Sequence, residues 1–198
     1  MLKVNDKNLY VHYPKTGGTF VREILKRYCK NQRIESNWYH SSHLILENVD
    51  IKDFEFTFAT VRNPVEWYQS AWKFLNDFLK RGKFREDEWN PLMPLEDCYN
   101  DDFNKFIENC LNQYPSYYSN SLKLYLGENY NAIDFVLKTE TLSFDICKVL
   151  KRINVKHNPL DILNCPKFGQ RVRPLTWDDY LKKQIIKNEM NVIQTFYL

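Results

Sequence analysis

Residues 8–19, NLYVHYPKTGGT, constrain the fold more than any other stretch of the chain. The apolar first half is typical of a buried strand, and it ends at Pro14 and Lys15. Gly17 and Gly18 then allow the backbone to turn sharply and to present its N–H groups to an anion at the start of a helix. We therefore predict a strand, a phosphate-binding loop and a helix in direct succession.

The order of residues separates this loop from the P-loop of nucleotide triphosphatases. In that P-loop the lysine follows the last glycine, as GxxxxGK[ST], and the next hydroxyl residue binds magnesium. Here Lys15 precedes both glycines, and the chain contains no GK[ST] sequence. Another type of phosphate site and a plain strand-to-helix turn both remain compatible with the loop alone.

A second motif lies at residues 54–72, FEFTFATVRNPVEWYQSAW. Its first part is largely apolar and β-branched, as in a strand that is covered on both faces. Asn63 suits a helix N-cap, Pro64 suits the first helical position, and Glu66 at the third completes an approximate capping box. A helix is therefore predicted to begin directly after the strand.

Arg62 and Ser70 are the candidate phosphate ligands of this second motif. Arg62 precedes the predicted cap, and Ser70 lies about two helical turns further on. A guanidinium offers a planar fork of donors suited to a phosphate, and a serine hydroxyl adds another donor. A salt bridge at a strand end and a neutral surface serine are the alternative interpretations.

Together the two motifs resemble the sulfotransferases that use 3′-phosphoadenosine 5′-phosphosulfate, in particular the carbohydrate-type members. Residues 14–19 are similar to their 5′-phosphosulfate loop, and residues 61–72 are similar to their 3′-phosphate site. One departure is Trp67, where relatives often carry a second arginine, and we interpret it as a packing change. The resemblance is specific over residues 8–72, moderate over 130–153 and weak beyond.

The resemblance implies a role for each residue of the two motifs. Backbone N–H groups of the loop would hold the 5′-phosphosulfate, and Lys15 would stabilise the charge that develops on the bridging oxygen. Arg62 and Ser70 would hold the 3′-phosphate, and the scheme requires no metal. The nucleotide-binding residues expected in the loop are Lys15, Thr16, Gly17, Gly18 and Thr19.

His43 is the general base that the resemblance implies, within the segment HSSHL between the two motifs. Many carbohydrate-modifying relatives carry a histidine in this interval, and a neutral imidazole can take the proton from an attacking hydroxyl. His40 and Glu47 are weaker candidates, and either histidine could instead be a surface or capping residue. His12, in the first strand, is expected to be a packed strand histidine.

Residues 73–127 are aromatic and polar, and we expect a helical and looped excursion that shapes the acceptor site. Asp102 is a suitable N-cap for a helix within it. The tyrosines Tyr114, Tyr117 and Tyr118 either stack on sugar rings or pack in the core.

Three basic residues, Lys167, Arg171 and Arg173, lie on a predicted loop near the C-terminus. Similar enzymes commonly close over the nucleotide with a late basic loop, so these side chains either meet the 3′-phosphate or an anionic acceptor, or are solvated. Thr176 and Asp179 then form a capping-box pattern for a last helix.

A third strand and helix are predicted within residues 132–153. AIDFVLK is the strand, and apolar residues from Phe144 to Ile153 mark one face of the helix. Relatives have a similar Glu-x-Leu step between the two elements, and we expect a structural role for Glu140.

The order of these elements favours one α/β domain over residues 1–198. Strands alternating with helices predict a parallel sheet flanked by helices on both faces, with ligands bound at the carboxyl ends of the strands. Lys15 and Arg62 both lie at such ends, so the two motifs are expected to converge. The resemblance implies the P-loop-like, three-layer form of this fold.

Composition bounds the cellular setting more than the chemistry. The net charge of +3 is too small to indicate nucleic acid. The five cysteines are widely spaced and contain no CxxC pair, so neither a zinc site nor a disulfide framework is indicated. No stretch approaches the roughly 20 apolar residues of a membrane span, and the N-terminus lacks the apolar core of a signal peptide. We expect a soluble, cytoplasmic protein.

These observations predict a sulfotransferase that moves a sulfuryl group from 3′-phosphoadenosine 5′-phosphosulfate to a hydroxyl and releases 3′-phosphoadenosine 5′-phosphate. The HSSHL segment and the form of the loop favour a carbohydrate or glycolipid acceptor, while a small alcohol and a peptide tyrosine stay open. One alternative is a non-catalytic module that binds the nucleotide or an anionic polymer. Another is a P-loop-type nucleotide kinase, which would need magnesium and a lysine after the glycines.

Overall fold

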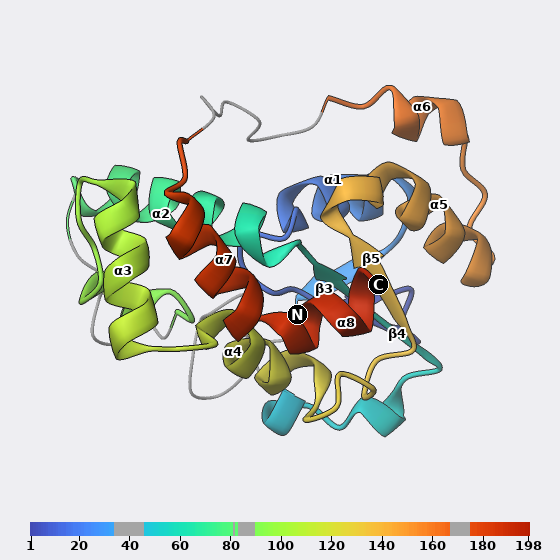
Figure 1. Cartoon of the computed structure of the whole chain (residues 1–198). Helices are drawn as coiled ribbons and strands as arrows, with labels where there is room; N and C mark the ends of the chain where they lie inside the picture. The colour runs from blue at the N-terminus through green and yellow to red at the C-terminus, as the bar shows by residue number, and fades with distance from the viewer. Residues whose placement is uncertain (34–45, 81, 83–89, 167–174) are drawn as a thin grey trace.

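The computed structural model has an α/β fold, with helices on both sides of one central sheet (Figure 1). The structure describes residues 1–33, 46–80, 82, 90–166 and 175–198. Within these segments, no helix has the length and apolar character needed to cross a membrane.

The described strands form one mixed sheet in the order β3-β1-β2-β4-β5. Strands β2, β4 and β5 are parallel to one another, as predicted. Strand β1 runs antiparallel to both β2 and β3. The expectation of a wholly parallel sheet is therefore wrong at this edge. The strand bounds are β1 Leu2–Val4, β2 Asn8–Val11, β3 Asn31–Arg33, β4 Phe56–Val61 and β5 Phe135–Lys138.

The antiparallel edge originates in a tight turn at the N-terminus. Asn5 and Asp6 have φ values of 48° and 61°, a region that asparagine and aspartate tolerate better than most residues. The turn reverses the chain so that Val4 pairs with Asn8. Because β1 is only three residues long, its sequence shows too little alternation to predict a strand.

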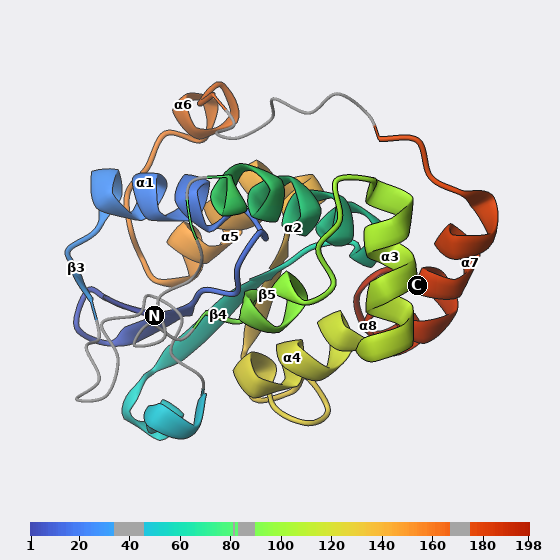
Figure 2. The same ribbon diagram turned by 90° about the vertical axis from the view of Figure 1, so that its left-hand side faces the viewer.

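One face of the sheet is covered by the first helix and by two helices that follow β5. Tyr10 of β2 and Phe58 of β4 point into this core. The helices that cover it are α1 (Gly18–Tyr28), α5 (Leu142–Arg152) and α6 (Pro159–Leu163). Figure 2 shows α1 and α5 on the same side of the strands.

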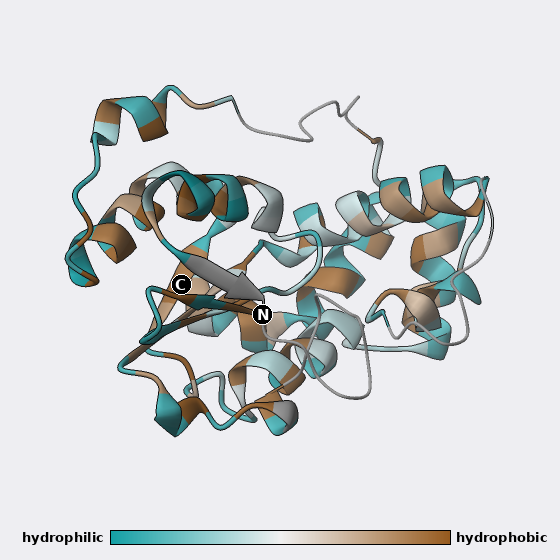
Figure 3. Ribbon diagram, turned by 180° about the vertical axis from the view of Figure 1, so that it is seen from behind, coloured by the Kyte–Doolittle hydropathy of each residue, from teal (hydrophilic) through white to brown (hydrophobic). Residues whose placement is uncertain are grey.

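The opposite face carries a larger core, which includes Val11 of β2 and Ala59 of β4. Its helices are α2 (Pro64–Leu79), α3 (Phe103–Gln113), α4 (Tyr117–Leu126), α7 (Asp179–Asn188) and α8 (Met190–Phe196). Figure 3 shows helices that carry both teal and brown residues, as expected where each helix has one buried and one solvated face.

The helix after β5 forms as predicted, but its buried face differs from the expected one. Leu142, Ile146, Val149 and Leu150 are buried, at spacings of three and four residues that place them on one stripe. Phe144 lies off this stripe and is 62% exposed. The expectation that Phe144 marks the apolar face is wrong for this reason.

The last predicted helix is present but starts and ends differently from the prediction. Asp178 is the N-cap, and its carboxylate accepts a hydrogen bond from the Leu181 N–H at 2.9 Å. The expected capping box of Thr176 and Asp179 is therefore wrong, because the helix is capped two residues after Thr176. The helix also breaks at Glu189, which separates α7 from α8.

Candidate functional site

A cavity of about 760 Å³ lies where the three parallel strands end. Lys15 follows β2, Arg62 follows β4 and Thr139 follows β5, and all three residues line it. Its volume is in the range of about 300–1,000 Å³ that is typical of small-molecule sites. Both predicted phosphate motifs therefore face one cavity, at the carboxyl edge of the sheet.

The glycine loop between β2 and α1 requires its two glycines for different reasons. Gly17 has φ +87°, and a Cβ there would lie 2.6 Å from Leu142 Cδ2. A Cβ on Gly18 would lie 1.9 Å from His12 Nε2, so the imidazole ring occupies the space that any other side chain needs. Lys15 also has a left-handed backbone, with φ 64°. The loop is thus a tight turn packed directly against neighbouring side chains.

The start of α1 lies open at this cavity. Gly17 is the N-cap, and as a glycine it has no side chain that could accept a hydrogen bond from the first turn of the helix. The first N–H groups of a helix lack intrahelical acceptors, and together they attract anions. Gly17, Gly18 and Thr19 all line the cavity. The helix start therefore lies at the cavity, and anion binding by its N–H groups stays a prediction.

Thr16 holds the loop in place through its side chain, which is fully buried. Its hydroxyl lies 2.6 Å from the Tyr13 carbonyl oxygen, to which it donates, and 2.7 Å from Thr60 Oγ1. The Thr16 carbonyl oxygen accepts a hydrogen bond from Thr139 Oγ1 at 2.9 Å. The Thr139 hydroxyl also lies 2.9 Å from the Val61 carbonyl oxygen. The ends of all three parallel strands are therefore joined beneath the cavity.

Trp67 ties the glycine loop to α2. Its indole Nε1–H donates a hydrogen bond to the Pro14 carbonyl oxygen at 3.0 Å, and its ring is fully buried. The ring stacks on Tyr118 with centroids 4.6 Å apart. The interpretation of Trp67 as a packing residue agrees with this position, and the contact also fixes the residue that precedes Lys15.

Lys15 projects along the cavity wall rather than into solvent. Its Nζ lies 4.2 Å from the centroid of the Phe74 ring, a cation–π contact. Burial, followed by the nearby positive charge of Arg62, lowers the pKa of Lys15 to about 8. The ammonium is still charged at neutral pH, but it loses its proton far more readily than an exposed lysine.

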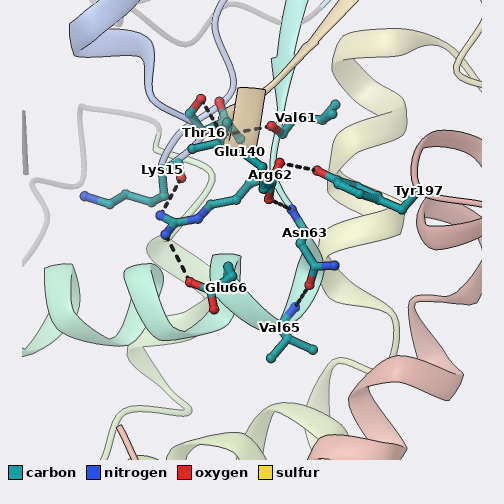
Figure 4. Close-up of polar contacts among 10 residues, drawn as sticks. Lys15, Thr16, Val61, Arg62, Asn63, Val65, Glu66, Glu140 and Tyr197 are labelled. Carbon is teal, nitrogen blue, oxygen red and sulfur yellow. Dashed lines mark hydrogen bonds and ion pairs between the residues drawn. The ribbon is translucent and has the colours of Figure 1, made fainter. Parts of the chain in front are cut away.

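Arg62 lies between the glycine loop and α2 (Figure 4). Its Nη1 donates a hydrogen bond to the Lys15 carbonyl oxygen at 3.4 Å, and its Nη2 pairs with Glu66 Oε2, also at 3.4 Å. Both contacts are long for charged groups, which ordinarily approach to about 2.7–2.9 Å. The guanidinium is therefore held loosely by protein atoms and can exchange these contacts for a closer anion.

The start of α2 is capped differently from the prediction. Asn63 Oδ1 accepts a hydrogen bond from the Val65 N–H at 3.0 Å, which confirms the N-cap. The Asn63 N–H, however, donates to Glu140 Oε1 at 2.8 Å instead of to Glu66. The predicted capping box is wrong because the Glu66 carboxylate turns to the Arg62 guanidinium, and a carboxylate distant in sequence takes its place.

Ser70 lines the same cavity from α2, as predicted, and its hydroxyl has no hydrogen-bond partner among the described residues. Lys73 lies one turn further along the helix and also lines the cavity. Burial lowers the pKa of Lys73, although the nearby Glu66 carboxylate opposes this shift.

The charge of the cavity wall is unbalanced. Among the described residues that line it, four carry a positive charge and one carries a carboxylate. A cavity with this excess suits a ligand with several negative charges. The charged residues are Lys15, Arg22, Arg62, Lys73 and Glu66.

Several of the predicted site residues lie outside the described residues. They are the candidate bases His43 and His40 and the basic residues Lys167, Arg171 and Arg173. Glu47, the weaker candidate base, belongs to a short 3-10 helix and does not line the cavity.

The tyrosine cluster of the excursion packs in the protein instead of facing the cavity. Tyr118 is fully buried, and the Tyr114 and Tyr117 rings contact each other with centroids 5.8 Å apart. None of these three lines the cavity, so the core alternative holds for them. Among the described residues beyond the end of α2, Asn90 and Leu92 of the excursion line the cavity.

His12 is a cavity residue that the sequence analysis did not assign to the site. It is largely buried and stacks on Tyr10 with centroids 6.0 Å apart, as a packed strand histidine would. It also lines the cavity and contacts Gly18. Its position directly after the apolar run and before the glycine loop was the available indication, because residues at a strand end reach the ligand edge of such sheets.

Comparison with family models, with curated protein sequences and with solved structures gave no match. The geometry and chemistry of the cavity therefore carry the functional argument.

Proposed function

We propose that this protein is a sulfotransferase that transfers a sulfuryl group from 3′-phosphoadenosine 5′-phosphosulfate to a hydroxyl acceptor. The observation that carries the proposal is the convergence of two separate phosphate-type motifs on one cavity. The Arg62 guanidinium lies 3.4 Å from the Lys15 carbonyl oxygen, so the two ends of one compact nucleotide can reach both motifs. The excess of positive charge on the cavity wall supports a donor with several negative charges.

In the proposed complex, each end of the nucleotide meets a different kind of group. The N–H groups at the start of α1 hold the 5′-phosphosulfate, and Arg62 and Ser70 hold the 3′-phosphate. A 3′-phosphate distinguishes this donor from ATP. The P-loop-like, three-layer form of the fold belongs to the same proposal, supported by parallel strands whose ends open into a glycine loop and a helix.

The proposed reaction is an in-line transfer. The acceptor oxygen forms a bond to sulfur while the bond from sulfur to the bridging phosphate oxygen breaks, and the electron pair stays on that oxygen. Protonated Lys15 stabilises this developing charge, and a general base takes the hydroxyl proton of the acceptor. The resemblance assigns the base to His43 and favours a carbohydrate or glycolipid as acceptor.

The test has a binding stage and a transfer stage. Titration calorimetry with 3′-phosphoadenosine 5′-phosphate should give tight binding, and ATP with magnesium should bind much more weakly. Labelled sulfate from the donor should then appear on a member of a panel of glycans, glycolipids, phenols and peptides. A preference for ATP with magnesium would contradict the proposal in favour of a kinase, and nucleotide binding without any transfer would favour a binding module.

Lys15→Ala gives the test its residue-level control. Because Lys15 acts mainly on the leaving oxygen, we expect turnover to fall far more than nucleotide affinity. Lys26→Ala is the matched variant, since it removes one positive charge from an exposed position of α1 outside the cavity. Equal turnover in the two variants would remove Lys15 from the mechanism.

A further inference from the structure

Arg62 lies in the short connection between β4 and α2, where its backbone groups are part of neither element. β4 ends at Val61, and α2 has Asn63 as its N-cap. The Arg62 N–H and carbonyl therefore belong to neither a strand ladder nor a helix, and such backbone groups need other partners when they are removed from water. The partners that they find are side chains from distant parts of the chain.

Tyr118 of α4 supplies the first support. Its hydroxyl donates a hydrogen bond to the Arg62 carbonyl oxygen at 3.0 Å and accepts one from the Arg62 N–H, also at 3.0 Å. Tyr118 is itself fixed, because its ring stacks on Trp67 and its N–H donates to the buried Glu189 carboxylate at 3.1 Å. One hydroxyl group on a rigid ring thus holds both backbone groups of Arg62.

Glu140, just after β5, supplies the second support. Its Oε1 accepts a hydrogen bond from the Asn63 N–H at 2.8 Å, and its Oε2 accepts one from the Tyr197 hydroxyl at 3.1 Å. Figure 4 shows Arg62 extending toward Lys15 on one side, while Glu140 and Tyr197 lie toward the other side of the backbone. The Tyr197 hydroxyl therefore orients the Glu140 carboxylate, which in turn holds the Asn63 N–H.

We propose that Tyr118 and Glu140 are positioning residues for Arg62, which set where its guanidinium meets the ligand phosphate. This inference rests on the proposed function. Neither residue lines the cavity, so both act through the backbone of Arg62 and Asn63. Because the guanidinium contacts with Lys15 and Glu66 are both long, its placement depends on where its backbone is held.

The experiment compares two ligands that differ in the phosphate assigned to Arg62. 3′-Phosphoadenosine 5′-phosphate carries the 3′-phosphate and adenosine 5′-monophosphate lacks it. Affinities are measured by calorimetry for Tyr118→Phe and Glu140→Ala, each in the wild-type and the Arg62→Ala background. Glu140→Gln is the conservative variant, since its amide oxygen can still accept from the Asn63 N–H.

Tyr130→Phe is the matched control for the loss of a buried hydroxyl. The Tyr130 hydroxyl donates to the Ser119 carbonyl oxygen at 3.1 Å, next to Tyr118 on α4, but it makes no contact with Arg62. A variant that only loosens α4 should therefore behave like Tyr130→Phe.

We expect Tyr118→Phe and Glu140→Ala each to weaken the bisphosphate about tenfold, as residues of one hydrogen-bond network do, and to change the monophosphate by less than about twofold. In the Arg62→Ala background, Tyr118→Phe and Glu140→Ala should cause no further loss of affinity for the bisphosphate. Glu140→Gln should restore most of the affinity, and Tyr130→Phe should leave the ratio of the two ligands unchanged. Equal weakening of both ligands, or a full loss on top of Arg62→Ala, would overturn the positioning role.

Failure of the proposed function gives a different result. In that case the wild-type protein itself shows no preference for the bisphosphate over the monophosphate. The positioning of Arg62 is then decided by the NMR signal of its Nε–H group. This signal should shift and broaden in Tyr118→Phe and Glu140→Ala but not in Tyr130→Phe, and an unchanged signal in all three variants would contradict the inference.

Discussion

The starts of α1 and α2 occupy equivalent places in the fold, but their first N–H groups are capped in different ways. Each follows a buried parallel strand and faces the same cavity. At α1 the N-cap is Gly17, which has no side chain to cap the first turn. At α2 the Asn63 side chain caps the helix and Pro64 occupies its first turn. In the proposed complex the first helix presents its backbone to the ligand, whereas the second has its backbone capped and presents the Arg62 side chain.

This difference predicts different responses to mutation. A side chain can be removed, so the contribution of Arg62 can be deleted directly. Among the natural residues only proline removes a backbone N–H, and it also restricts the backbone, so the loop N–H groups are better disturbed by a new side chain that changes the shape of the loop. The tight packing around Gly17 and Gly18 makes that route effective.

The largest expected effect is that of Gly18→Ala. Its Cβ would lie 1.9 Å from His12 Nε2, and the imidazole is packed against Tyr10 and has little room to move. The loop must shift, so we expect affinity for 3′-phosphoadenosine 5′-phosphate to fall about 100-fold, the value of roughly one strong charge-assisted hydrogen bond. Calorimetry measures this loss.

The double variant His12→Ala with Gly18→Ala is the control for this clash. Removing the imidazole makes room for the new methyl group, so part of the affinity should return. If Gly18→Ala alone binds the nucleotide as tightly as the wild-type protein, the loop does not hold it through the backbone.

The next largest effect is expected for Arg62→Ala. Loss of the guanidinium should weaken 3′-phosphoadenosine 5′-phosphate by about 10–100-fold, because hydrogen bonds to charged groups contribute about 1.5–3 kcal/mol. Adenosine 5′-monophosphate should be almost unaffected. Competition binding with both ligands checks the prediction, and equal losses for the two would detach Arg62 from the 3′-phosphate.

Glu66→Gln is the counterpart with the opposite sign. The carboxylate competes with the ligand for the guanidinium at 3.4 Å, so its neutralisation should tighten binding of the bisphosphate a few-fold. Weaker binding would mean that Glu66 supports the bound state instead of opposing it.

The effect of pH on affinity should depend on Lys15. Its pKa of about 8 means that the ammonium is charged below that pH and neutral above it. The anionic nucleotide prefers the charged form, so affinity should fall as pH rises from 7 to 9, by up to about tenfold. Binding at pH 8 should also take up protons from the buffer.

Lys15→Ala should flatten this pH profile, because the titrating group is gone. Calorimetry in two buffers with different ionisation enthalpies measures the proton uptake. The same pH dependence in Lys15→Ala would assign the titration to another group.

The smallest effect on binding is expected for Asn63→Ala. This variant loses the hydrogen bond from the Val65 N–H and should lower the free energy of unfolding by about 1 kcal/mol. The Tm should fall by about 2–4 °C for a protein of this size. Nucleotide affinity should stay within about twofold, because the capped end of α2 contributes a side chain and not its N–H groups.

Calorimetric unfolding and nucleotide titration of Asn63→Ala together sharpen the contrast with α1. A large loss of affinity with unchanged stability would mean that the start of α2 also binds the ligand through its backbone.

Much of the site was predictable because local chemistry governs it. The strand before Pro14, the glycine turn and the Asn63 cap are each encoded within a few neighbouring residues. That Lys15 and Arg62 share a cavity followed from both lying at the carboxyl ends of adjacent parallel strands.

The incorrect capping box at the start of α2 involves competition from a distant group. Glu66 has the correct spacing for a capping box, but the Arg62 guanidinium attracts it, and Glu140 reaches Asn63 from 77 residues away. Tyr118 shows an aromatic pattern that suits sugar stacking equally well, until its hydroxyl is found on the Arg62 backbone.

The amino-acid order of this chain determines where strands end, where helices begin and which residues at those ends carry charge, because these features depend on backbone preferences and on neighbours within one or two turns. The mixed sheet, the lowered pKa of Lys15 and the supports of Arg62 were decided only by the tertiary structure. Each depends on which groups from remote parts of the chain are buried together, and burial strengthens hydrogen bonds and charge interactions that sequence spacing alone cannot rank.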